Sequence, residues 1–276
     1  MIIMRFPEGK RKALTLSYDD GVEQDRTLLD ILNAAGLKCT FNLNSGCFPP
    51  EGHVWPEGQI HRRMTRSAVQ ALYGAPHEVA VHTLTHPDLT QLPMNLMVRE
   101  IGQDRINLEE IFGGVIRGAA YPFGTYSDET VQALKSCGIV YCRTVNSSHD
   151  FAIPQDWLRL RPTCHHDDPM LDELCSRFLE DSAYFNSKLF YLWGHAYEFE
   201  ANDNWQRIRD FAAKMGGHED IWYCTNIEAY DYVAAWEQLL ASADGLTFAN
   251  PTATDLWAEE NGRVFAIPAG KTVKIS

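Results

Sequence analysis

The hydrophobic pattern of the chain alternates between short apolar runs and longer stretches with helical spacing. The short, β-branched or aromatic runs predict strands at 14–18, 39–44, 78–81, 118–121, 140–145, 158–164, 189–193 and 221–224. Between them, apolar residues recur every three to four positions and predict helices near 28–35, 65–73, 94–112, 127–137, 171–184, 205–215 and 227–241. Strands that alternate with helices indicate a parallel sheet, and this number of units predicts an α/β fold, a distorted (β/α) barrel of about seven parallel strands.

The end of the chain follows a different pattern. Residues 245–276 hold short β-like pieces at 246–248, 263–267 and 272–275, with proline and glycine between them. This stretch is too short to form an independent domain. We therefore expect residues 1–244 to form the barrel and residues 245–276 to form a small β appendage packed on it.

Composition limits the classes of partner. The chain has 276 residues, 45% of them hydrophobic and 22% charged, which is enough for one large core and argues against disorder. Its net charge of -13 argues against nucleic acid or an anionic membrane surface as partner, because phosphates would be repelled. A neutral substrate fits this charge better.

The cysteines and the N-terminal pattern predict a cytoplasmic protein. The 7 cysteines are scattered and include no Cys-x-x-Cys pair, which favours reduced thiols over a disulfide framework. The sequence shows no apolar signal-peptide region before the first strand and no stretch of the length of a membrane span.

Polar residues that could carry chemistry follow three of the predicted strands. Asp19 and Asp20 follow the first strand, His82 follows the third, and His195 follows the seventh. In a parallel α/β barrel, functional groups gather at the carboxyl ends of the strands, so we expect these side chains to meet. Taken alone, Asp-Asp-Gly is also an ordinary turn composition.

His82 and His86 have a spacing that suits metal binding. Four residues apart, they would place two imidazoles on one face of a helical turn. Two imidazoles and one carboxylate form the open ligand set of a catalytic zinc site. A single histidine is more often a core or surface residue, but a spaced pair facing two carboxylates favours a metal site.

Four motifs along the chain resemble those of a known family. Ser17-Tyr-Asp-Asp-Gly21, His82-Thr-Leu-Thr-His-Pro87, Tyr121-Pro-Phe-Gly124 and Leu192-Trp-Gly-His195 occur in this order. Together they resemble the motifs of the polysaccharide deacetylases, carbohydrate esterase family 4, which includes chitooligosaccharide deacetylases. The resemblance covers most of the predicted barrel and implies that fold.

The resemblance also implies a reaction and the residues that perform it. It implies a site for a divalent metal ion with three ligands: Asp20, His82 and His86. Nitrogen and oxygen ligation with two imidazoles favours zinc. Asp19 would be the base that takes a proton from a metal-bound water, and His195 the acid that protonates the leaving group. The backbone N–H of Phe123 would stabilise the oxyanion.

The chain departs from the family pattern at two positions. The family has an arginine four residues before the glycine of the third motif, where it orients the catalytic aspartate, and this chain has Ala120. Arg117, Arg159 or Arg161 could supply that charge, and the sequence does not choose among them.

The second departure concerns the aspartate that, in the family, supports the acid histidine. Position favours Asp150, followed by phenylalanine, whereas composition favours Asp156, followed by tryptophan, and we assign the role to Asp150. For substrate binding we expect Tyr126, Trp193 and Arg161. The run Cys164-His-His-Asp-Asp168 reads as a solvated turn in preference to a second metal site.

The sequence thus predicts a metal-dependent hydrolase that removes N- or O-linked acetyl groups from a carbohydrate. Because the chain shows no export signal, we expect an acetylated mono- or oligosaccharide as substrate in place of an intact wall polymer. Two alternatives stay open: hydrolysis of a C–N bond in a non-sugar amide or cyclic ureide on the same barrel, and a non-catalytic carbohydrate-binding relative. The oligomeric state cannot be read from the sequence.

Overall fold

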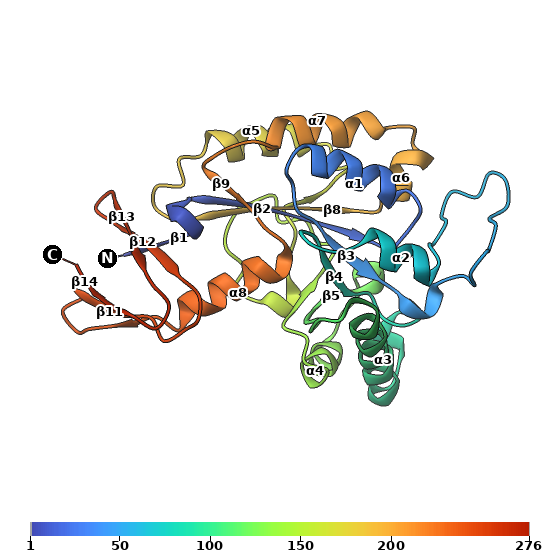
Figure 1. The fold of residues 1–276 in the computed structure, drawn as a ribbon, viewed down its shortest axis with the longest axis horizontal. Coiled ribbons are helices and arrows are strands. Elements are labelled where there is room, and N and C mark those ends of the chain that lie inside the picture. The colour runs from blue at the N-terminus through green and yellow to red at the C-terminus, as the bar shows by residue number, and fades with distance from the viewer. Residues whose placement is uncertain (1, 276) are drawn as a thin grey trace.

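The apolar runs form one curled parallel sheet in the computed structural model, which describes residues 2–275 (Figure 1). In spatial order its strands are β6 (Tyr141–Arg143), β5 (Gly118–Ala120), β4 (Glu78–Val81), β3 (Thr40–Leu43), β2 (Lys12–Asp19), β8 (Lys188–Gly194) and β7 (Cys164–His165), and β9 (Ile221–Tyr223) pairs with the start of β2. Every residue of β2 is buried, as expected for a central strand covered on both faces. A parallel bridge joins Arg143 of the edge strand β6 to Leu160, in the segment that leads into the other edge strand, β7, so the predicted distorted barrel of about seven strands is confirmed.

Helices cover the outside of the sheet. They are α1 (Asp25–Ala34), α2 (Arg66–Leu72), α3 (Met94–Phe112), α4 (Asp128–Ser136), α5 (Leu171–Glu180), α6 (Ala196–Ala201), α7 (Trp205–Met215) and α8 (Asn226–Glu237). In Figure 1, α1, α5, α6 and α7 lie above the sheet, α2 lies beside β3, and α3 and α4 lie below the sheet. The side chains of Thr65, Ser127 and Thr225 cap the first turns of α2, α4 and α8. Among the described residues, no helix is both long and apolar enough to cross a membrane.

Some predicted elements differ from the structure, and one helix was not predicted. The sixth strand was expected over 158–164, but Trp157–Arg159 form a 3₁₀ turn capped by Asp156, which leaves only the two residues of β7. The helix predicted over 171–184 ends at Glu180. The short helix α6 was not predicted, because six residues after a strand carry no readable helical period.

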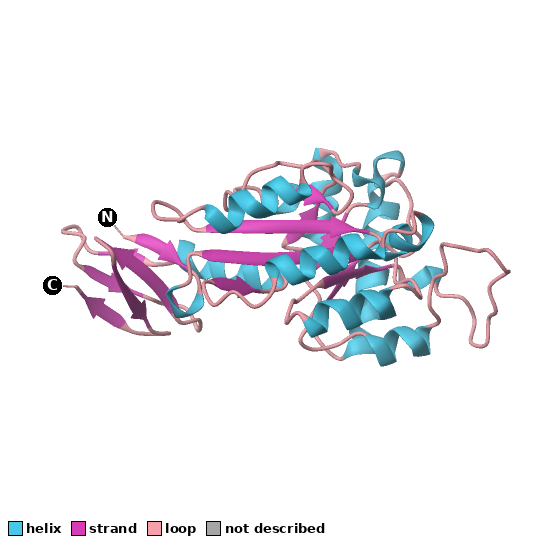
Figure 2. Ribbon diagram, turned by 90° about the horizontal axis from the view of Figure 1, so that it is seen from above, coloured by secondary structure: helices cyan, strands magenta, loops and turns pink. Residues whose placement is uncertain are grey.

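Two small antiparallel sheets lie at the end of the molecule that holds both chain termini (Figure 2). One contains β1 (Ile3–Arg5), β12 (Leu256–Glu260) and β13 (Arg263–Ile267), and the other β10 (Leu240–Ala241), β11 (Thr247–Ala249) and β14 (Thr272–Lys274). The sequence placed this appendage in residues 245–276 alone. The structure adds β1 from the start of the chain and β10 from before that boundary.

A buried arginine connects the small sheets to the barrel. Arg5 is fully buried and donates from Nε to Oε2 of Glu259 at 2.8 Å, and Arg11 donates from Nη2 to Oε1 of the same carboxylate at 2.9 Å. Arg5 also donates to the backbone carbonyls of Ala183 and Tyr184, in the segment between α5 and β8. One carboxylate therefore pairs with two guanidinium groups at the junction.

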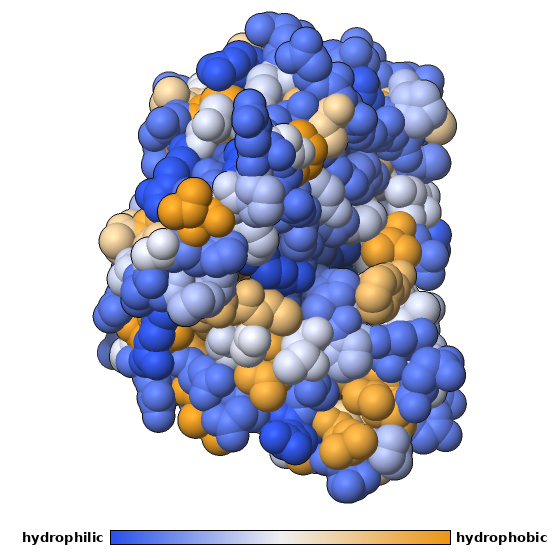
Figure 3. Space-filling model, turned by 90° about the vertical axis from the view of Figure 1, so that its right-hand side faces the viewer, coloured by the Kyte–Doolittle hydropathy of each residue, from blue (hydrophilic) through white to orange (hydrophobic). Residues whose placement is uncertain are grey.

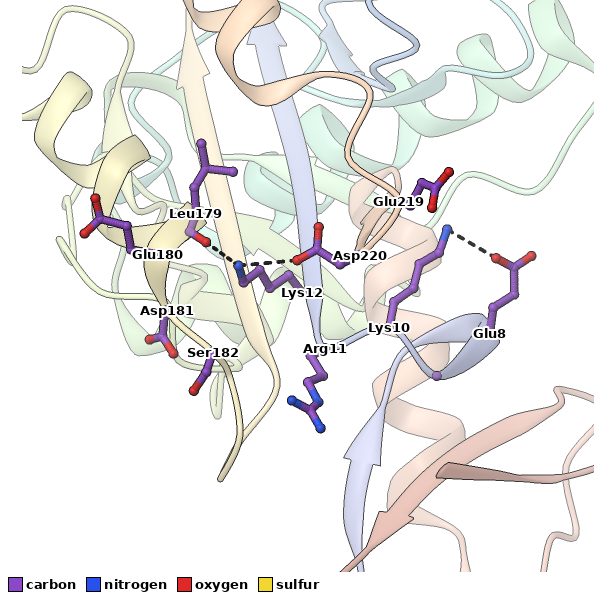
Figure 4. Close-up of a pocket in the computed structure, with 11 residues that line it drawn as sticks. Glu8, Lys10, Arg11, Lys12, Leu179, Glu180, Asp181, Ser182, Glu219 and Asp220 are labelled. Carbon is purple, nitrogen blue, oxygen red and sulfur yellow. Dashed lines mark hydrogen bonds and ion pairs between the residues drawn. The ribbon is translucent and has the colours of Figure 1, made fainter. Parts of the chain in front are cut away.

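A cavity of about 860 Å³ lies at the amino end of β2, away from the carboxyl ends of the strands (Figure 4). Its lysines have partners within the protein: Lys12 Nζ lies 2.7 Å from the carbonyl oxygen of Leu179 and 3.4 Å from Asp220, and Lys10 lies 3.2 Å from Glu8. These contacts give each lysine of the cavity a partner within the protein. In a parallel α/β barrel, functional groups gather at the other end of the sheet, at the carboxyl ends of the strands.

We expect Glu259→Ala to destabilise the fold by about 3–5 kcal/mol, because it leaves Arg5 buried without its counter-charge. Urea unfolding would measure this change. Glu8→Ala, which removes an exposed ion pair, should change the free energy of unfolding by less than about 0.5 kcal/mol. Equal effects of the two substitutions would contradict this account of the junction.

Candidate active site

The carboxyl ends of the strands meet on a hollowed face whose centre is hydrophilic (Figure 3). Asp19 is the last residue of β2 and only 2% exposed, and Asp20 follows it. His82 follows β4, and His195 follows β8. The sequence predicted that these side chains would gather, and the structure brings them together.

The backbone around this face adopts unfavourable conformations. Four non-glycine residues here have positive φ: Asp20 (82°), Thr83 (67°), His86 (60°) and Phe123 (58°). The left-handed region costs a non-glycine residue roughly 1–3 kcal/mol, and such residues persist where surrounding contacts hold them. Their concentration at one face marks it as the candidate site.

The two histidines of the His-x₃-His motif converge, though not through a helical turn. Residues 82–88 form no helix, and the predicted turn is replaced by an irregular loop with positive φ at Thr83 and His86. The ring centroids of His82 and His86 nevertheless lie 4.8 Å apart. Asn44 holds this loop by donating from Nδ2 to the carbonyls of His82 and Thr83.

Asp20, His82 and His86 fit a divalent cation. One ligand atom from each lies within 4.8 Å of the other two. His82 Nδ1 lies 2.9 Å from the carbonyl of Ala120, which can only accept, so Nδ1 carries the proton and Nε2 keeps a free lone pair. Burial lowers the pKa of His82 to about 4, which keeps the imidazole in its neutral, ligating form.

Two residues that sequence reasoning missed contact Asp20. His61 Nε2 lies 3.1 Å from Asp20 Oδ2, and Arg63 donates from Nη2 to Oδ1 at 2.8 Å. Burial alone would raise the pKa of Asp20, but the His61 hydrogen bond and the Arg63 charge hold it well below its ordinary value. Both residues belong to the long segment between β3 and α2, which carries no pattern that points to the site.

Asp19 is held as an ionised carboxylate. Asn42 donates to its Oδ1 at 2.8 Å, Arg143 donates to its Oδ2, and His82 Nε2 and His195 Nε2 each lie 3.8 Å from Oδ2. Burial acts to raise the pKa of Asp19, but the charge of Arg143, helped by the two histidines, holds it below its ordinary value.

Arg143 supplies the charge that the third motif lacks. It is the last residue of β6, is fully buried, and its guanidinium lies 4.2 Å from the ring centroid of Trp193. The three arginines that the sequence offered lie elsewhere: Arg117 pairs with Asp231, Arg159 with Asp128 and Asp156, and Arg161 donates to the carbonyl of Ser147. An arginine inside an apolar strand was the signal that could have found it.

Phe123 and His195 complete the cluster. Phe123 lies in the turn Pro122–Gly124, is 64% exposed, and its ring centroid lies 4.7 Å from that of His86. His195 Nδ1 lies 3.3 Å from Oε1 of Glu198 in α6. Burial disfavours the charged imidazole, yet Glu198 and Asp19 together raise the pKa of His195 above its ordinary value.

Other predicted site residues lie outside the cluster. Asp150 is exposed and its Oδ1 accepts from the N–H of Ala152, and within the described residues it makes no contact with His195. Arg161 lines a separate cavity that also includes Asp150. Tyr126 packs on Tyr121 at 5.5 Å between ring centroids. Trp193 does lie beside His195, but it is only 8% exposed and is covered by Arg143.

Comparison with known proteins identifies the family. The model of the polysaccharide deacetylase family matches residues 7–142, which include Asp19, Asp20, His82 and His86. This part of the chain belongs to the polysaccharide deacetylase family. A chitooligosaccharide deacetylase of Rhizobium leguminosarum bv. phaseoli is 30% identical over 149 residues, which cover 53% of this chain and 57% of the relative. The chain thus spans little more than half the length of this curated relative.

Solved structures of polysaccharide deacetylases and related esterases share the fold. A putative polysaccharide deacetylase from Mycobacterium smegmatis superposes with a TM-score of 0.60 at 17% identity, covering 85% of this chain and 94% of the other. The chitin deacetylase of the fungal pathogen Colletotrichum lindemuthianum gives 0.52 at 19% identity, covering 82% and 90%. A family 4 carbohydrate esterase from Streptomyces lividans gives 0.50 at 18% identity, covering 78% and 92%.

Arg143→Met should destabilise the protein by about 3–5 kcal/mol at pH 7, because it leaves the Asp19 carboxylate buried without its counter-charge. The native pair lowers the pKa of Asp19, so its stabilising effect is present above the ordinary aspartate pKa of about 4 and fades as the pH falls below it. The loss in the variant should therefore shrink on acidification. Urea unfolding at pH 7 and at about pH 3, below the ordinary aspartate pKa, would measure both values.

Arg26→Met is a matched control, because Arg26 forms an exposed pair with Glu23 and should contribute at most about 1 kcal/mol. A loss for Arg143→Met that is the same at both pH values would mean that Arg143 acts by packing alone and not by pairing with Asp19.

Proposed function

We propose that this polysaccharide deacetylase homologue is a metal-dependent hydrolase that removes N- or O-linked acetyl groups from a carbohydrate. The observation that carries the proposal is that the two adjacent carboxylates at the end of β2 have different partners. Asp20 lies with two imidazoles, whereas Asp19 lies with Arg143 and faces His195. A bound cation and a free base are the two functions that water activation requires.

Asp20, His82 and His86 would hold the cation, and their nitrogen and oxygen donors favour zinc. When bound, a divalent ion there supplies Lewis-acid polarisation of the acetyl carbonyl and lowers the pKa of water. Arg63 and His61, in the segment between β3 and α2, hold the Asp20 carboxylate in place. Such support of a ligating carboxylate fixes its orientation.

The chain's own groups account for the proton transfers. Asp19, ionised beside Arg143, takes a proton from the water that attacks the acetyl carbon. The N–H of Phe123 donates to the carbonyl oxygen as it becomes negative. His195, whose pKa is raised, carries a proton near neutral pH and gives it to the departing nitrogen or oxygen as that bond to the acetyl carbon breaks. The products are acetate and the deacetylated sugar.

Several observations support an acetylated mono- or oligosaccharide as the substrate. The curated relative is a chitooligosaccharide deacetylase, and a chitin deacetylase shares the fold. The exposed ring of Phe123 beside His86 offers an apolar surface against which a sugar face could pack. All seven cysteines are free, which supports a reducing compartment such as the cytoplasm.

Acetate release from acetylated oligosaccharides, measured with and without a chelator, tests the proposed reaction. We expect release by the zinc-loaded protein, loss of release after chelation, and recovery when zinc is returned. Release that persists after complete removal of metal would contradict metal dependence. If the protein releases acetate from no acetylated sugar but hydrolyses cyclic ureides, its reaction is the hydrolysis of a C–N bond in a non-sugar substrate.

Substitutions at the adjacent carboxylates should separate metal binding from proton transfer. Asp20→Ala and His82→Ala should lose both bound metal and acetate release, because each removes a ligand. Asp19→Asn should retain one metal per chain while the rate falls by about 10²–10⁴-fold, because an amide cannot take the proton. Elemental analysis and initial rates measure the two properties. Normal turnover by Asp19→Asn would show that Asp19 is not the base.

A further inference from the structure

Glu198 lies within reach of three imidazoles at the carboxyl end of β7 and β8. Its Oε2 lies 3.1 Å from His165 Nε2 and 3.3 Å from His166 Nε2, and its Oε1 lies 3.3 Å from His195 Nδ1. The same carboxylate accepts the backbone N–H of His195 at 3.1 Å. None of these groups belongs to the motifs that place the chain in its family, apart from His195.

The backbone determines which nitrogen of His165 carries the proton. The N–H of Asp167 donates to His165 Nδ1 at 3.1 Å, so Nδ1 must be the unprotonated nitrogen. The proton of the neutral imidazole is therefore on Nε2, which faces Glu198. A protonated Nε2 has no lone pair to offer a metal ion, so His165, His195 and Glu198 do not form a three-ligand cation site, although their donor atoms lie within 4.8 Å of one another.

The tautomer of His195 follows from charge and not from a hydrogen bond, because its Nδ1 lies 3.3 Å from Oε1 of Glu198 without hydrogen-bond geometry. An ionised Glu198 can only accept, so the His195 nitrogen that faces it, Nδ1, carries a proton. The proton available for transfer is then the one on Nε2, the nitrogen that faces Asp19 Oδ2 at 3.8 Å. The charged side chains facing His195 are Asp19 on one side and Glu198 on the other, and the rings of Trp193, Tyr197 and His165 surround it.

His166 and Gly194 explain why Glu198 lies so close to His195. His166 is buried and stacks between Tyr18 and Phe199, at 5.7 and 4.1 Å between ring centroids. A Cβ at position 194 would lie 2.0 Å from His166 Nδ1, so only glycine fits before His195. This packing sets the turn from β8 into α6 that brings Glu198 beneath His195.

We infer that His165 and Glu198 are positioning residues for His195: the protonated Nε2 of His165 and the protonated Nδ1 of His195 both face the Glu198 carboxylate, which leaves Nε2 of His195 to deliver the proton. This inference rests on the proposed deacetylation. It assigns to Glu198, three residues after the acid histidine, the support that the sequence had assigned to Asp150. His165 adds a second donor that orients the carboxylate.

Histidine NMR on the zinc-loaded full-length protein, labelled with ¹⁵N at the imidazoles, tests the inference independently of turnover. In the wild type, neutral His195 should be protonated at Nδ1. Glu198→Gln should lower the pKa of His195 by about one unit and reduce kcat by about 10–100-fold, with KM changed by less than about threefold. His165→Gln, whose amide can still donate to Glu198, should retain more activity than His165→Leu.

His218→Gln is the matched control, because His218 contacts the carbonyl of Lys214 at the end of α7, and this variant should behave as the wild type. An unchanged tautomer and pKa of His195 in Glu198→Gln would overturn the inference. A second bound zinc ion that is lost in Glu198→Gln and kept in Asp20→Ala would overturn it in favour of a cation site. If the wild type releases no acetate, the proposed function fails, whereas the tautomer and pKa still decide the role of Glu198.

Discussion

The ion pair between Arg143 and Asp19 is the interaction on which the site depends. Both side chains are buried at the carboxyl end of the barrel, where an unpaired charge would cost several kcal/mol. Arg143 comes from an edge strand and Asp19 from the central one, so the pair forms only when the sheet has curled. The curl of the sheet therefore brings Asp19, the proposed base, to the cation that keeps it ionised. Trp193 beneath the guanidinium limits its movement and keeps it directed at Asp19.

This ion pair also bears on the choice between reactions. The absence of the third-motif arginine was the reason to keep hydrolysis of a non-sugar C–N bond as an alternative. Because Arg143 delivers a guanidinium to Asp19 from another strand, that departure no longer distinguishes the chain from a sugar deacetylase. No contact among the described residues specifically favours the ureide reaction.

The sequence sufficed for those site residues that end a strand. Asp19, Asp20, His82 and His195 could be found because each lies at the carboxyl end of a predicted strand. A parallel barrel brings the carboxyl ends of its strands together. Arg143 could not be assigned, because its partner lies 124 residues earlier and only the closure of the sheet brings the two together.

Three further misses had equally physical causes. Glu198 lies on a helix too short to show a period, so its direction could not be predicted. His61 and Arg63 lie in a long irregular segment, whose path depends on tertiary contacts. Asp150 was chosen by its place in the order of motifs, but the chain there turns outward and the carboxylate caps its own loop.

The arrangement of charges explains how one small site can hold a base and an acid at the same pH. Asp19 and His195 face each other at 3.8 Å, and each makes the charged form of the other more stable. The charges of Asp19 and His195 do not depend on that contact alone, because Asp19 also pairs with Arg143 and His195 also lies beside Glu198. The four groups alternate in sign, cation, anion, cation, anion, from β6 across β2 to α6. In the proposed reaction Asp19 gains a proton from water and His195 gives one to the leaving group, while the two outer charges, Arg143 and Glu198, keep their charge beside them.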